Sequence, residues 1–79
     1  MTKEASPLEL AKEHVAAADA AVGTQRRVVE DMKARGQNAV EAEVHLIELM
    51  QDLEEAQARL QTIEAEAASA ILQRSSGKS

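Results

Sequence analysis

The sequence predicts an all-α fold: two long antiparallel helices that form a coiled-coil-like αα-hairpin, with two such hairpins pairing into a four-helix bundle. Apolar residues recur at alternating spacings of three and four, which keeps them on one face of a helix. A helix stop and a helix start stand back to back at residues 35–38. Hydrophobic residues make up 44% of the chain, but nearly half of them are alanine and none is aromatic.

The first helix is expected over residues 7–35. Ser6, Pro7 and Glu9 match the preferred residues at the N-cap, the first helical position and the third. The apolar seam of this helix then runs through Leu8, Ala11, Val15, Ala18, Val22, Gln25, Val29 and Met32. Gly23 costs about 1 kcal/mol relative to alanine inside a helix. The seam nevertheless passes Gly23 in register, so we expect one continuous helix.

The hairpin corner is expected at residues 36–38. Gly36 suits the left-handed position just past a helix end. Asn38 suits an N-cap, and Glu41 completes a variant of the capping box. The second helix is expected over residues 39–73, with a seam of Ala39, Ala42, Leu46, Leu49, Leu53, Ala56, Leu60, Ile63, Ala67 and Ala70. Residues 1–74 thus form a single helical hairpin, and residues 75–79 are expected to be a flexible tail.

Folding the chain at this corner sets which residues lie at the same height. The expected layers are Val15 with Leu60, Ala18 with Ala56, Val22 with Leu53, and Val29 with Leu46. The same register places Lys12 near Glu64 and Lys33 near Glu43, as exposed ion pairs that select orientation more than they stabilise. Gln25 lies opposite Leu49. Two interpretations of Gln25 stay open: a buried amide that fixes the register, and a long side chain that reaches water.

Such a hairpin has little large apolar surface to bury, and small scaffolds without disulfides or metals usually gain stability by association. Several apolar residues also lie off the seam, and a second copy would cover them. We therefore expect a homo-oligomer, most simply a dimer, or another protein partner. The interface is predicted at Ala21, Val28, Val40, Val44, Ile47, Met50, Ile71 and Leu72.

Composition argues against several function classes. The net charge of −5 and the pI near 4.9 disfavour nucleic-acid and anionic-membrane partners. No stretch has the apolar length of a membrane span or a signal peptide, and there is no cysteine, so we expect a cytoplasmic protein. No phosphate loop, nucleophile–base pair or converging carboxylates are present, so we expect no enzyme, catalytic residue or cofactor.

One group of residues on the second helix has side chains of the kind that bind metals. Glu41, His45 and Glu48 share one helical face at i, i+4 and i+7. Carboxylate-bridged di-iron bundles instead use Glu-x-x-His on paired helices, a motif this chain lacks. The other histidine, His14, is expected on the order of 20 Å from His45, at 1.5 Å of rise per residue. We therefore expect no metal site within one chain.

The pattern resembles a group of small bacterial, chiefly proteobacterial, helical-hairpin proteins of uncharacterised function. The residues that carry the resemblance are His14-Val15-Ala16 with Ala18, Gln25-Arg26, the Gly36 and Asn38 corner, and Ala42 with Leu46 and Leu53. The resemblance covers roughly residues 10–60. It implies a bacterial cytoplasmic setting and brings no activity, cofactor or site residue.

The sequence therefore favours a non-enzymatic module for protein–protein interaction and oligomerisation. The alternative is a small regulatory adaptor that docks on a partner protein through the stripe from Val40 to Met50. A metal-binding helical bundle is the remote alternative.

Overall fold

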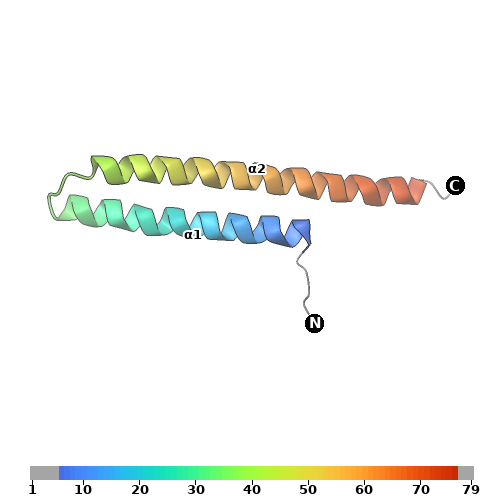
Figure 1. The fold of residues 1–79 in the computed structure, drawn as a ribbon, viewed down its shortest axis with the longest axis horizontal. Coiled ribbons are helices and arrows are strands. Elements are labelled where there is room, and N and C mark those ends of the chain that lie inside the picture. Colours follow the sequence, from blue (N-terminus) through green and yellow to red (C-terminus); the bar gives the residue numbers. More distant parts are fainter. Residues whose placement is uncertain (1–5, 77–79) are drawn as a thin grey trace, which may run out of the picture.

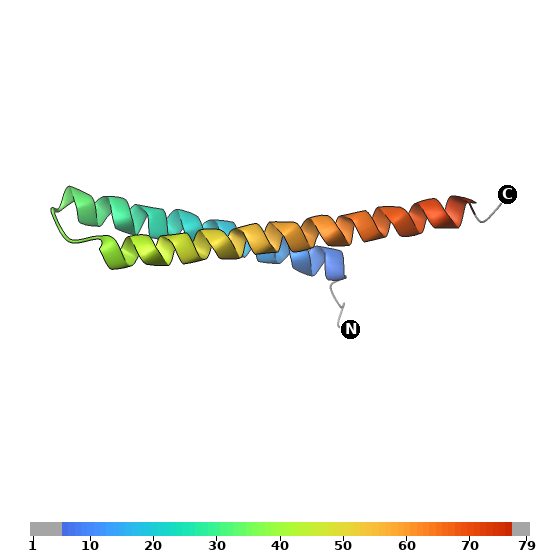
Figure 2. The ribbon, with the colours of Figure 1, turned by 90° about the horizontal axis from the view of Figure 1, so that it is seen from above.

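The computed structural model describes residues 6–76, with side chains placed through residue 72. It contains helix α1, Pro7–Ala34, and helix α2, Val40–Ser76. The helices run antiparallel and side by side (Figure 1), and Figure 2 shows them crossing at a shallow angle. The all-α hairpin expected from the sequence is confirmed.

Both helices begin at a side-chain cap. Ser6 Oγ accepts a hydrogen bond from Glu9 N at 3.1 Å, and Asn38 Oδ1 accepts one from Val40 N at 3.0 Å. Each bond satisfies a backbone N–H that the helix itself leaves without a partner. Within the described residues, no hydrogen bond from the Asn38 N–H to the Glu41 carboxylate completes the expected capping box. The second helix thus starts one residue later than expected, at Val40.

The corner is a Schellman motif, which explains why α1 stops where it does. Gln37 N donates to Met32 O at 2.8 Å, and Gly36 N donates to Lys33 O at 3.0 Å. These two bonds satisfy carbonyls at the end of the helix, and they require the residue after the C-cap to be left-handed. Gly36 has φ +72° and is the one described residue with a positive φ. The glycine is therefore required by the backbone and not by crowding, because an added Cβ would meet nothing within 4 Å.

We expect Gly36→Ala to lower the free energy of unfolding by about 1–2 kcal/mol, the cost of placing an ordinary side chain in the left-handed region. Gly36→Asn is the matched control, since asparagine visits that region more readily. Urea unfolding followed by circular dichroism measures both. Equal midpoints for alanine and asparagine would contradict the assigned role of the positive φ.

The interior of the protein is the heptad seam. Its buried members are Ala11, Val22, Val29, Ala39 and Ala56. The other seam residues of α1, and those of α2 through Ile63, are half-buried, so each lies where the heptad pattern placed it. No large side chain among the described residues is fully buried. Among the described residues, the hairpin therefore has a thin core in which the buried positions are alanine and valine.

The two helices differ in length, which leaves the end of α2 projecting beyond the start of α1 (Figure 1). Helix α2 has 37 residues and α1 has 28, so the projection is roughly 14 Å at 1.5 Å per residue. Ala67 and Ala70 continue the seam there but are exposed. The helix also includes residues 75 and 76, which were expected in the tail. No glycine or proline interrupts it before Gly77. The rest of that tail, residues 77–79, lies outside the described residues.

Candidate association surface

Large aliphatic side chains remain exposed over the whole hairpin. Their exposed fractions run from 40% for Val28 to 68% for Leu72. Within residues 6–72, these side chains are Leu10, Val28, Val40, Val44, Ile47, Met50, Ile71 and Leu72. Ala21, the remaining residue of the predicted interface, is half-buried. Leu10 was not among the predicted interface residues. It lies between the seam residues Leu8 and Ala11 in the chain, and only the heptad spacing shows that it is off the seam.

The structure divides these residues among different sides of the hairpin. Ile47 and Met50 line one groove between the helices, which we call the Met50 groove. Ala21 lines a second groove, the alanine groove. On α1, Ala21 and Asp19 flank the seam on opposite sides. Asp19 lines the Met50 groove. One flat partner surface therefore cannot cover Ala21 and Met50 together.

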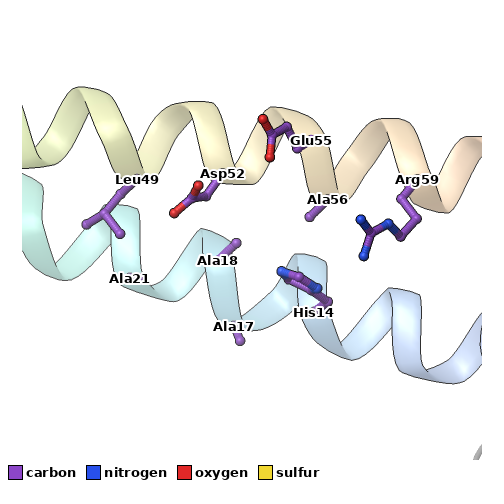
Figure 3. Close-up of a pocket in the computed structure, with 9 residues that line it drawn as sticks. All are labelled: His14, Ala17, Ala18, Ala21, Leu49, Asp52, Glu55, Ala56 and Arg59. Atoms are coloured by element: carbon purple, nitrogen blue, oxygen red, sulfur yellow. The ribbon is translucent and has the colours of Figure 1, made fainter.

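Small residues form much of the alanine groove. Ala18 of α1 and Ala56 of α2 both line it, in agreement with the expected register (Figure 3). The complete lining is His14, Ala17, Ala18, Ala21, Leu49, Asp52, Glu55, Ala56 and Arg59. None of the exposed large aliphatic residues is among them. The α2 side of this groove carries two carboxylates, whereas the α1 side carries no acid.

The Met50 groove has a more apolar lining on α2. Val22 and Leu53, which share a layer in the expected register, both line it. Two exposed aliphatic side chains stand beside them, and the complete lining is Asp19, Val22, Arg26, Ile47, Met50, Gln51, Leu53, Glu54 and Gln57. An apolar centre flanked by charges of both signs is the usual anatomy of a protein–protein contact. The Met50 groove is thus the better candidate for an association surface.

Gln25 joins the two helices across the seam. Its Nε2 donates to the Ala42 carbonyl at 3.0 Å, and the side chain is half-buried. Of the two interpretations left open by the sequence, this geometry matches the amide that fixes the register. A half-buried amide keeps its hydrogen bond only if the helices hold their relative height. A shift along the seam would therefore cost that bond.

Ion pairs follow the expected register near the corner. Lys33 Nζ lies 3.0 Å from Glu43 Oε2, as the hairpin pairing predicted. The other predicted pair, Lys12 with Glu64, does not form between these described side chains. A further pair joins Arg35 Nη2 to Asp31 Oδ2 at 3.3 Å within one turn. The four paired side chains are 44–67% exposed, so each pair contributes about 0.2–1 kcal/mol at most.

The acid-flanked histidine makes one local contact. His45 Nδ1 lies 3.6 Å from Glu48 Oε1, with both side chains exposed. Over the part of the chain that the structure describes, no three histidine, aspartate or glutamate side chains form a group that could hold a metal ion. A metal at His45 would therefore need ligands from another chain.

Similarity to known proteins does not indicate a function for this chain, so the proposed function rests on the surface of the hairpin. No protein-family model, curated protein or solved structure matches this chain significantly. Neither described helix combines the length and apolar character needed to cross a bilayer.

Proposed function

We propose that this chain is a non-enzymatic association module whose first partner is a second copy of itself. The proposal includes a bacterial cytoplasmic setting, which the family resemblance implies. Pairing of two hairpins gives a four-helix bundle, in which each copy covers apolar side chains that the other leaves in water.

One observation carries the proposal: among the described residues, as many large aliphatic side chains are exposed as are half-buried, and few are buried. The five buried hydrophobic residues are three alanines and two valines, whereas eight valine, leucine, isoleucine and methionine side chains are at least 40% exposed. Burying such a side chain contributes about 1.5–3 kcal/mol. A small domain with so thin a core gains more from association than from any rearrangement of its own two helices.

Sedimentation equilibrium tests the proposal. We expect a dimer at micromolar concentration, with a helical circular dichroism signal that becomes more heat-stable as protein concentration rises, because association stabilises the folded state. A monomer that is equally stable at every concentration would overturn it.

A regulatory adaptor is the second candidate, and one observation favours it. Val40 and Val44 are 60% and 52% exposed and line neither groove. They would be free to contact a partner protein together with Ile47 and Met50, as an apolar stripe on one helix. Helicity that is weak in the isolated chain and rises on addition of a partner would support this candidate. A metal-binding bundle would require melting that shifts with added Zn²⁺, Fe²⁺ or Mn²⁺.

A further inference from the structure

We infer that the second copy docks in the Met50 groove, with α1 of each copy against α2 of the other and both hairpin corners at the same end. This inference rests on the proposed self-association and specifies its geometry. Three observations carry it: the charges along the two edges of the groove, its exposed apolar side chains, and a glycine on its α1 side.

The seven-residue lines that flank the seam on the side of the Met50 groove carry opposite net charge, while the groove lining itself holds Asp19 and Arg26 on α1 and Glu54 on α2. Every seventh residue of a coiled-coil helix lies along one line. On α1 that line is Lys12, Asp19, Arg26 and Lys33, with a net charge of +2. On α2 it is Glu43, Met50, Gln57, Glu64 and Ile71, with a net charge of −2. The ion pair between Lys33 and Glu43 shows that both lines run along the same side of the hairpin.

Two-fold symmetry then allows two face-to-face arrangements. An axis parallel to the helices places α1 on the partner's α2 and keeps the corners together. An axis perpendicular to the helices, in the plane of the interface, places α1 on α1 and α2 on α2, with the corners at opposite ends. The second arrangement sets positive edge against positive edge and negative against negative. Charge complementarity therefore favours the first arrangement.

Gly23 supplies an independent reason for a partner at this groove. It lies four residues after Asp19 and three before Arg26, so it shares the helix face of two residues that line the groove. An added Cβ at Gly23 would meet nothing within 4 Å, and its φ is not positive. Neither crowding nor backbone conformation within one chain explains a glycine in the middle of α1. A second helix packed closely against that face does explain it.

The apolar content of the groove fits the same occupant. Ile47 and Met50 stand on the α2 side of the groove, and Val22, which precedes Gly23 in the chain, lines the α1 side. In the arrangement with the corners together, these bulky side chains of one copy meet the glycine face of the other. Ile71 lies on the same seven-residue line as Met50. The projecting ends of the two α2 helices, one from each copy, therefore turn the helix face that carries Ile71 toward each other.

Substitutions at the two grooves test which face binds. Gly23→Leu adds bulk at the Met50 groove with a better helix former, and Ala17→Leu adds similar bulk at the alanine groove. We expect Gly23→Leu to raise the dimer dissociation constant more than tenfold while the chain stays helical. We expect Ala17→Leu to change the constant less than threefold. The opposite ranking would overturn the assignment to the Met50 groove.

A distance across the dimer tests the arrangement. Since the chain has no cysteine, Gln37→Cys carries a single spin label at the corner, and pulsed electron paramagnetic resonance measures the distance between copies. Corners at the same end give a distance on the order of 20 Å, from helix spacings of ~10 Å and the length of the labels. Corners at opposite ends give ~40 Å or more, the length of α1. The long distance in a stable dimer would overturn this arrangement alone, whereas a monomer in sedimentation would overturn the proposed function.

Discussion

Leu46→Asp should abolish the folded hairpin at room temperature. Leu46 is a half-buried seam residue on α2, expected in the layer of Val29, which is 6% exposed. The substitution removes an apolar side chain whose truncation alone costs about 2–5 kcal/mol in a core, and it places a carboxylate against apolar neighbours. No basic residue lies one turn before or after position 46 on α2 to pair with the new carboxylate. Glu43, which is one turn before it, would repel the new charge. We expect a loss of about 4 kcal/mol, comparable to the whole stability of a small domain.

The matched control for this substitution is Leu10→Asp, which makes the same chemical change at a side chain that is 55% exposed. Leu10 is in the first turns of α1, where a negative charge interacts favourably with the helix dipole. We expect less than about 0.5 kcal/mol of change there, as at most surface sites. Circular dichroism at one protein concentration compares the two. A helical Leu46→Asp protein would show that the seam contributes much less than its burial indicates.

The architecture could be predicted because each local signal agreed with the next. The spacing of apolar residues defined the seam, and every seam residue through Ile63 is buried or half-buried, with Ala21 and Glu43 as half-buried residues beside it. Ser6, Gly36 and Asn38 each have a single favourable role at a helix end, so the ends were predicted to within a residue or two at the corner. At the end of α2 the prediction followed the fading seam and not Gly77, and the predicted boundary fell three residues short.

The surface was harder to predict, because seam periodicity does not show how off-seam residues group. The predicted interface residues were chosen for lying off the seam, and they fall on both sides of the hairpin. A count of every seventh residue would have separated the sides, since it brings Asp19 and Arg26 into one line and Ala21 and Val28 into another. The hydrogen bond from Gln25 to a carbonyl needed coordinates, because a long amide side chain has many accessible rotamers.

The double variant Ile47→Gln with Met50→Gln should abolish dimerisation while leaving the hairpin helical. Both side chains are exposed in the single hairpin, at 56% and 44%, so the change costs little within one chain. In the dimer, each side chain loses about 1.5 kcal/mol of burial at the lower end of the usual range. Because the dimer is two-fold symmetric, each substitution occurs in both copies. The total loss of binding free energy is then about 6 kcal/mol, or roughly four orders of magnitude in the dissociation constant.

The matched control is Leu10→Gln with Val28→Gln, which removes two exposed aliphatic side chains from the other side of the hairpin without a change in charge. Counted in sevens, Leu10 shares a line with Ala17 and Val28 shares one with Ala21, and both of those residues line the alanine groove. Sedimentation equilibrium should therefore still detect the dimer. If a partner protein binds the stripe from Val40 to Met50 instead, the Ile47 and Met50 variant weakens that binding and leaves any self-association of the hairpin unchanged. If the Met50 groove holds a second copy, only the Ile47 and Met50 variant releases it. A dimer that survives this variant would mean that the copies meet elsewhere, because no contact there can lose four apolar side chains without weakening.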